Sequence, residues 1–171
     1  MCPCDDNLAP LLFFHGKESG PFGSKYRALS SEFSVTSPDF QGLDIWERLE
    51  KAEFLTEGME DALLVGSSYG GLLAALLYSR HPGRFKGYVL LAPAFYPPHA
   101  VAMSTITRVP DNAVVIHGTQ DEIVPLSEVE DFCNSMGLPL VVVEDGHRLK
   151  GSYDEMMEWV QKIHSKATQA T

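Results

Sequence analysis

Six short apolar runs recur along the chain, and stretches with amphipathic helical spacing lie between them. Within each run the apolar positions are continuous rather than alternating, which is typical of parallel strands that are covered on both faces. The pattern predicts strands at Leu8–Phe14, Phe33–Thr36, Ala62–Val65, Tyr88–Leu91, Ala113–Ile116 and Leu138–Val143. It predicts helices at Lys25–Glu32, Ile45–Thr56, Tyr69–Arg80, Leu126–Ser135 and Tyr153–Ser165.

This alternation predicts an α/β fold: a doubly wound, mainly parallel sheet of about six strands with helices on both faces. No repeat, low-complexity segment or linker divides the chain, so residues 1–171 are expected to form a single domain. Residues 1–7 are expected to be a mobile tail. The segment 93–110 fits the alternation of strands and helices least well, because its prolines break regular structure. It is either a loop with a short helix packed on the sheet or a small apolar flap beside a pocket.

The composition and net charge of the chain disfavour some classes of binding partner. The chain has 171 residues, of which 44% are apolar and 21% charged, which suits a globular core without disulfides. There are 13 basic and 23 acidic residues, and a net charge of −10 disfavours nucleic acid or an anionic membrane as partner. Because no apolar run is long enough to span a membrane and no signal peptide is recognisable, the expected location is the cytoplasm. The oligomeric state is left open.

The cysteines do not predict a metal or redox site. Their number, three, is odd, so they cannot form a complete disulfide framework. Cys2 and Cys4 form a C-x-C pair without a further ligand at metal-binding spacing. Cys133 lies in a predicted helix and is expected to be a small core residue. We therefore expect neither a bound metal nor a redox function from the cysteines.

A candidate nucleophile, Ser68, lies in the sequence Gly66–Gly70 between a predicted strand and a predicted helix. A serine in such a tight turn has a strained backbone, and the residues two before and two after it must lack a Cβ atom. Gly66 and Gly70 satisfy that demand. The same pattern also occurs in purely structural glycine-rich turns, so Ser68 needs a base and an acid to support a catalytic interpretation.

The base and the acid are sought where other strands end, because ligands bind beyond the carboxyl ends of parallel strands. Among six histidines, His147 follows the last predicted strand in a short loop before the final helix. Asp121 follows the preceding strand, with Glu122 as a second choice. An N-cap or turn role for Asp121 and a structural role for His147 remain the alternatives.

The order Ser68, Asp121, His147 is that of nucleophile, acid and base in α/β-hydrolases. The chain resembles this superfamily in four motifs: FFHGKESGP, VGSSYGG, HGTQDEIVP and EDGH. The likeness is greatest to small, cap-less esterases of the YqiA type. The resemblance implies a serine hydrolase that cleaves a carboxylic ester or thioester without a cofactor. It also implies that the chain begins at the third strand of the larger family and lacks a cap domain.

The resemblance further implies an oxyanion hole, a pair of N–H groups that bind the negative oxygen of the reaction intermediate. One N–H belongs to Tyr69 and the other to Lys17, whose ammonium group could favour an anionic substrate. Without a cap, substrate contacts are expected from Phe95, Tyr96 and Met103.

Other functions remain open at this stage. Peptidases and carbon–carbon bond hydrolases use the same constellation of residues. The glycines and lysines of Gly16–Lys25 could bind a phosphate or nucleotide, although their spacing matches no phosphate-binding motif. A binding protein of hydrolase fold with an idle triad is a third possibility.

Overall fold

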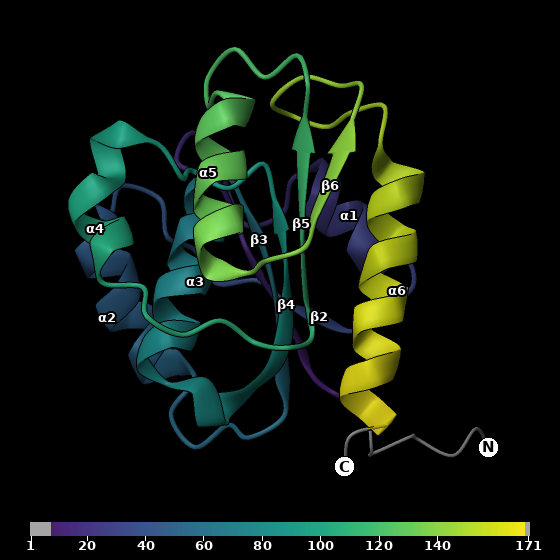
Figure 1. The fold of residues 1–171 in the computed structure, drawn as a ribbon. Coiled ribbons are helices and arrows are strands. Elements are labelled where there is room, and N and C mark those ends of the chain that lie inside the picture. The colour runs from purple at the N-terminus through teal and green to yellow at the C-terminus, as the bar shows by residue number, and fades with distance from the viewer. Residues whose placement is uncertain (1–7, 170–171) are drawn as a thin grey trace.

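The computed structural model describes residues 8–169, in which six strands form one open sheet (Figure 1). The strands are β1 (Leu11–Phe14), β2 (Val35–Thr36), β3 (Ala62–Ser67), β4 (Phe85–Leu91), β5 (Ala113–Gly118) and β6 (Leu140–Val143). The helices are α1 (Ser24–Ser30), α2 (Ile45–Leu55), α3 (Tyr69–Arg80), α4 (Ala100–Ser104), α5 (Leu126–Met136) and α6 (Tyr153–Gln169). Two short 3₁₀ helices, η1 (Pro82–Arg84) and η2 (Pro97–His99), complete the order.

The sheet has the strand order β2-β1-β3-β4-β5-β6, and every neighbouring pair is parallel. The chain therefore winds outward from β1 to β2 and then crosses back to build the rest of the sheet from β3. The carboxyl ends of β1 and β3 lie side by side at the point where the winding reverses, which is where ligands bind in such sheets. The predicted doubly wound fold is confirmed.

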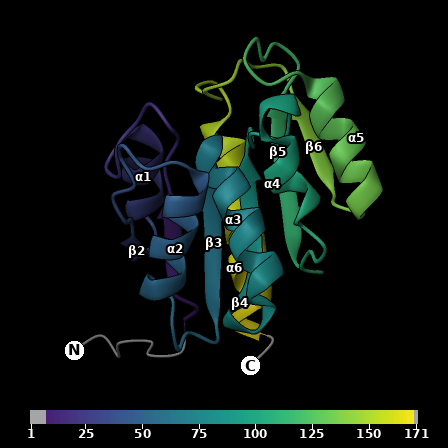
Figure 2. The ribbon, with the colours of Figure 1, turned by 90° about the vertical axis from the view of Figure 1, so that its left-hand side faces the viewer.

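Helices cover both faces of the sheet, as Figure 2 shows from the side of α2, α3 and α4. One core lies between the sheet and the helices α2, α3 and α5, and the other lies between the sheet and α1 and α6. Successive strand residues alternate between the two cores; Leu12 and Phe14 face the first, whereas Leu11 and Phe13 face the second. Two buried faces explain why the strands read as continuous apolar runs.

Two strands begin later than their apolar runs suggest, because proline cannot donate to a sheet ladder. The strand predicted from Leu8 starts at Leu11, after Pro10, whose carbonyl still accepts from the Leu63 N–H. The strand predicted from Leu138 likewise starts after Pro139, at Leu140. The predicted edge strand Phe33–Thr36 is only two residues long, Val35–Thr36.

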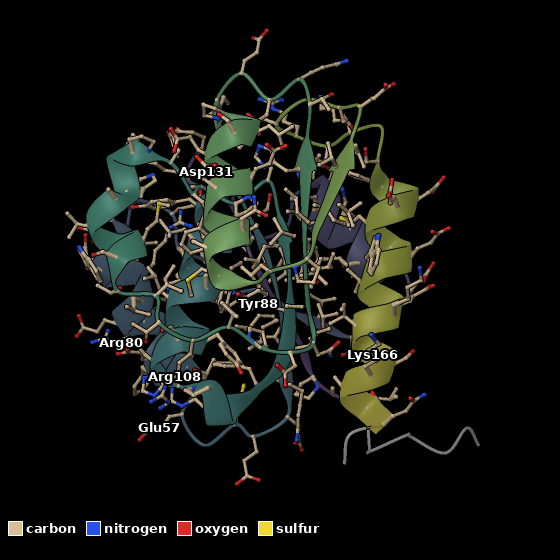
Figure 3. The ribbon with its side chains drawn as sticks, in the orientation of Figure 1. Glu57, Arg80, Tyr88, Arg108, Asp131 and Lys166 are labelled. Carbon is tan, nitrogen blue, oxygen red and sulfur yellow. The ribbon has the colours of Figure 1, made fainter. Side chains whose placement is uncertain are left out.

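Large apolar side chains fill the space between the sheet and the helices, whereas many charged side chains lie at the periphery. In Figure 3, Glu57, Arg80, Arg108 and Lys166 lie on the outside, whereas Tyr88 lies within the fold. Tyr88 is fully buried, and burial raises the pKa of its hydroxyl far above the ordinary value. The buried layers give the strand ends a rigid frame.

Further predictions concern single segments. Cys133 is buried in the core, as expected. The segment 93–110 contains η2 and the short helix α4, and α4 packs against α3. Residues 1–7, with the predicted tail and the Cys2–Cys4 pair, lie outside the described residues.

Candidate active site

Ser68 lies in a strained turn between β3 and α3. Its φ and ψ angles are 55° and −113°, in a region that L-residues other than glycine rarely adopt. A Cβ atom added to Gly66 would lie 2.3 Å from the Gly70 carbonyl oxygen, and one added to Gly70 would lie 2.0 Å from that of Phe14. Both glycines are therefore required for the tight turn, which presents the Ser68 hydroxyl at the amino end of α3.

Ser68, His147 and Asp121 form one chain of hydrogen bonds from three different strand ends. The Ser68 Oγ lies 2.8 Å from the His147 Nε2, and the His147 Nδ1 lies 2.7 Å from the Asp121 Oδ2. Because a carboxylate only accepts hydrogen bonds, Nδ1 carries the proton and Nε2 is free to accept from the Ser68 hydroxyl. This geometry suits proton transfer from a serine to a histidine.

The Asp121 carboxylate is fully buried and held by backbone donors. Its Oδ1 accepts from the N–H groups of Ile123 at 2.9 Å and Val124 at 2.8 Å, which leaves Oδ2 for His147. Burial alone would raise the pKa of this carboxyl group. The hydrogen bonds from His147, Val124 and Ile123 outweigh burial, so that the pKa lies below its ordinary value. Glu122, the second choice from the sequence, is exposed and its side chain makes no hydrogen bond or ion pair within the described residues.

The loop that carries His147 is organised by a different carboxylate. Asp145 accepts from the Gly146 N–H at 2.8 Å, the Gly151 N–H at 2.9 Å and the Ser152 hydroxyl at 2.8 Å. These bonds tie the loop after β6 to the start of α6. They hold the loop that carries His147, although none of them is made by the imidazole itself.

A second histidine, His117, contacts the same aspartate. Its Nε2 lies 2.9 Å from the Val124 carbonyl oxygen and 3.2 Å from the Asp121 Oδ2, and the side chain is fully buried. Burial lowers the pKa of His117, and the hydrogen bond to Val124 and the charge of Asp121 only partly oppose that effect. The neutral ring donates from Nε2 into the turn that holds Asp121.

Acid is expected to destabilise the fold between pH 7 and pH 5. Burial lowers the pKa values of His117 and His15 below the ordinary value of 6.5. The unfolded chain therefore binds more protons than the folded one below that pH. Their contribution to stability is present above about pH 6.5 and is lost below it, by up to about 1.4 kcal/mol per pH unit for each histidine.

Urea unfolding at pH 7.5 and pH 5.5 measures this effect. The urea midpoint of the wild type should fall at the lower pH, and the His117→Gln variant should show a weaker dependence on pH. Equal midpoints at both pH values in the wild type would contradict the expectation.

The two predicted oxyanion donors belong to residues near Ser68, since Tyr69 follows it in the chain and Gly16, which precedes Lys17, lies against it. Tyr69 is the first residue of α3, where the N–H groups have no partner inside the helix. Lys17 lies in the loop after β1, and its N–H makes no hydrogen bond within residues 8–169. Both residues line the cleft that contains Ser68 and His147. The structure thus places Tyr69 and Lys17 in the same cleft as Ser68.

The cleft has a volume of about 730 Å³ and joins the loops after β1, β3, β4, β5 and β6. Of the three predicted substrate contacts, only Tyr96 lines it. Phe95 does not: it is fully buried and stacks on Phe132 of α5, with ring centres 4.2 Å apart. Met103, a residue of α4, packs against the core and is not part of the lining either. Consecutive residues in extended backbone point in opposite directions, so Tyr96 and Phe95 face different sides.

Several lining residues were not anticipated. Further side chains of the cleft wall belong to His99, Ile123, Arg148, Lys150 and Tyr153. Arg48 does not line the cleft, but from α2 it donates hydrogen bonds to the His15 and Gly16 carbonyls in the loop after β1. A signal for Arg48 exists in the sequence, because it falls on the apolar stripe of Ile45, Leu49 and Ala52, where a charged residue is unusual.

The sheet order and the strained serine turn define the class of protein: the chain is a hydrolase of the α/β-hydrolase fold. A family model described as "Serine aminopeptidase, S33" (Hydrolase_4) matches residues 15–112, which is more than half of the chain. The chain belongs to this family of the α/β-hydrolase superfamily. The family assignment agrees with the resemblance stated from its motifs.

Solved structures share the fold at low sequence identity. Est1E from Butyrivibrio proteoclasticus has a TM-score of 0.76 at 17% identity, covering 95% of this chain and 90% of the other. A thermophilic esterase from Thermogutta terrifontis has a TM-score of 0.67 at 16% identity, covering 91% and 90%. The ydeN gene product from B. subtilis has a TM-score of 0.66 at 16% identity, covering 90% and 99%. No curated protein sequence matches the chain.

The described residues contain neither a membrane-spanning helix nor a cluster of metal ligands. Between residues 8 and 169, no helix combines the length and the apolar character needed to cross a membrane. Over the same range, no three His, Cys, Asp or Glu side chains are grouped so that they could hold a metal ion.

Proposed function

We propose that the chain is a serine hydrolase that cleaves carboxylic esters or thioesters through Ser68, His147 and Asp121. The observation that carries the proposal is the unbroken hydrogen-bond chain from Ser68 Oγ through His147 to a buried carboxylate. It starts from a serine whose backbone is held in a strained conformation. Strain of this kind persists where the surrounding structure maintains it, and it is concentrated at functional sites.

In the first half of the proposed reaction, Ser68 Oγ attacks the substrate carbonyl carbon and its proton moves to His147 Nε2. Asp121 stabilises the imidazolium through Nδ1. The negative oxygen of the tetrahedral intermediate accepts hydrogen bonds from the N–H groups of Tyr69 and Lys17. The intermediate expels the alcohol or thiol, which takes the proton from His147 Nε2.

In the second half, water attacks the acyl group on Ser68. His147 Nε2 accepts a proton from this water and returns it to Ser68 Oγ as the carboxylic acid leaves. The side chain of His147 is 15% exposed and lines the cleft, so water from the cleft can reach it. No other group is needed for either half of the reaction.

The cleft supports an ester rather than a peptide with a free amino terminus as the substrate. An aminopeptidase needs negative charge to bind the substrate ammonium group. The lining contains three basic side chains, those of Lys17, Arg148 and Lys150, and one acidic side chain, that of Glu18. Aromatic surface from Tyr69 and Tyr96 adds an apolar wall. An acyl ester or thioester with an apolar part and a negatively charged part fits this lining best.

A reporter-tagged fluorophosphonate tests the proposal, because it reacts with serines that a base has activated. Peptide mapping of the labelled wild type should find the tag on Ser68. A panel of neutral esters, anionic esters, thioesters and amino-acid anilides then defines the substrate class. If folded protein stays unlabelled with a probe small enough for the cleft, the proposed function is wrong.

A further inference from the structure

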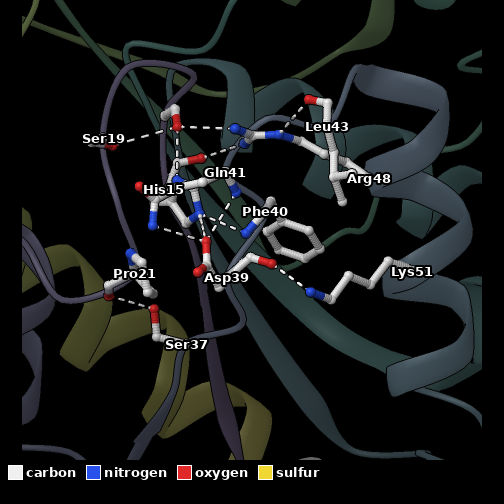
Figure 4. Close-up of polar contacts among 11 residues, drawn as sticks. His15, Ser19, Pro21, Ser37, Asp39, Phe40, Gln41, Leu43, Arg48 and Lys51 are labelled. Atoms are coloured by element: carbon white, nitrogen blue, oxygen red, sulfur yellow. Dashed lines mark hydrogen bonds and ion pairs between the residues drawn. The ribbon is translucent and has the colours of Figure 1, made fainter.

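Arg48 is a buried cation that contacts no acidic side chain within residues 8–169, and only the charge of the exposed Asp39 carboxylate acts on it through space. The residue is 0% exposed, and none of the ion pairs within residues 8–169 involves it. Its guanidinium donates only to backbone carbonyls: to His15 at 2.8 Å, Gly16 at 3.1 Å and Leu43 at 3.3 Å (Figure 4). Burying a charge without a counter-charge is costly. A specific use of Arg48 would explain why the fold tolerates it.

The Gly16 carbonyl accepts a second strong hydrogen bond, from His15. The Nε2 of His15 lies 2.8 Å from the Phe40 nitrogen, which can only donate. Nε2 therefore carries no proton, and the neutral ring bears its proton on Nδ1, which lies 2.7 Å from the Gly16 oxygen. Burial lowers the pKa of His15, which favours this neutral form. Arg48 and His15 together hold one carbonyl oxygen from two directions.

That carbonyl belongs to the same peptide unit as the Lys17 N–H. The described residues contain no cis peptide bond, so the carbonyl and the N–H of this unit point in opposite directions. With its oxygen turned toward Arg48 and His15, the peptide directs the Lys17 N–H away from them. A Cβ atom placed on Gly16 would lie 3.7 Å from the Ser68 Cβ, so the peptide lies against the nucleophile.

Arg48 also contacts the residue that supplies the other oxyanion donor. Its guanidinium carbon lies 4.8 Å from the centre of the Tyr69 ring, within the range of a cation–π interaction. The Tyr69 side chain is thereby held against the same buried cation that holds the Gly16 carbonyl. One side chain on α2 thus links the loop after β1 to the start of α3.

We propose that Arg48 is a positioning residue that fixes and polarises the oxyanion hole, by holding the Gly16–Lys17 peptide and the Tyr69 ring at once. This inference rests on the proposed function. A cation on the carbonyl oxygen draws electron density from the peptide and makes its N–H a stronger donor. The positive charge also favours the developing negative oxygen, which appears only as the reaction proceeds.

The test compares Arg48→Lys and Arg48→Met with the wild type. A lysine keeps the charge but can reach fewer of the three carbonyls, whereas methionine keeps only the apolar stem. The control is Arg84→Lys. Arg84 also donates to backbone, at 2.8 Å to the Glu53 carbonyl near the opposite end of α2, remote from the cleft.

Two measurements distinguish a role of Arg48 in positioning the oxyanion hole from a role in stabilising the fold alone. The first is kcat per active site, with sites counted by fluorophosphonate labelling. The second is the inhibition constant of a trifluoromethyl ketone, which forms a tetrahedral anion on an active serine. We expect kcat to fall about 10- to 100-fold in Arg48→Met and less in Arg48→Lys, with a parallel loss of inhibitor affinity and little change in KM. Arg84→Lys should change neither readout.

Each outcome decides the inference. If the Arg48 variants only reduce the number of labelled sites while kcat per site and the inhibition constant stay as in the wild type, Arg48 is structural and the inference fails. If Arg48→Met does not fold, Arg48→Lys alone decides through the same two readouts. If the wild type itself is not labelled, the proposed function has failed instead, which is a different result from a labelled wild type with unaffected Arg48 variants.

Discussion

Replacing Ser68 with alanine is expected to lower kcat for an ester substrate by roughly 10⁶-fold and to abolish fluorophosphonate labelling. Without Oγ, position 68 has no hydroxyl that could form an acyl-enzyme, and His147 loses its partner at 2.8 Å. Stability should change little, because alanine and serine carry the same Cβ and meet the same strain at a φ of 55°. The loss should therefore appear in activity and not in folding.

Steady-state kinetics and urea unfolding of the same preparations measure both sides of this expectation. Ser135→Ala is the control, because Ser135 is exposed on α5 and, within residues 8–169, its hydroxyl bonds only to the Phe132 carbonyl. A Ser68→Ala variant that keeps more than a trace of ester hydrolysis would show that another residue is the nucleophile.

Replacing Asp121 with asparagine is expected to lower kcat by about 10⁴-fold through the wrong tautomer of His147. The N–H groups of Ile123 and Val124 both point at the Oδ1 position, so the asparagine oxygen must occupy it. The amide NH₂ then faces the His147 Nδ1, which must accept rather than donate. The proton moves to Nε2, where it blocks the acceptance of the Ser68 proton.

The neighbouring carboxylate supplies the matched control for this experiment. Glu122 is exposed and follows Asp121 directly in the chain. Its replacement in Glu122→Gln also removes one negative charge, but it should leave kcat unchanged. The Asp121→Asn loss should be in kcat, with KM for the ester little affected. Equal activities of Asp121→Asn and Glu122→Gln would show that Asp121 does not orient His147.

Local patterns were sufficient to predict most of the fold. Apolar runs located all six strands, because a strand buried on both faces must be apolar at consecutive positions. The helix Tyr69–Arg80 was predicted with its observed ends, since its start follows a tight turn and its end precedes Pro82. The strand ends shifted by proline were missed because an apolar run does not show which residue can donate to the ladder.

For the candidate site, the positions of residues after the strands predicted which side chains meet. They did not predict which other groups hold those side chains in place. Ser68, Asp121 and His147 each follow a strand, and a parallel sheet brings all strand ends to one edge. Arg48 was not predicted as part of the site because its partners are backbone groups distant in sequence, such as the His15 carbonyl. No local pattern records such a contact.

The amino-acid sequence was enough to determine the class of this protein, since buried strands and a serine between obligatory glycines impose patterns on consecutive residues. The tertiary structure alone decided which side chains line the cleft. Phe95 and Tyr96 are neighbours with similar rings, yet one packs in the core and the other faces the cleft. Which of the two side chains is buried depends on the direction of each relative to helices that come later in the sequence, such as α5. The direction of a side chain is set by how the sheet and helices pack, and neither composition nor the spacing of residues predicts it.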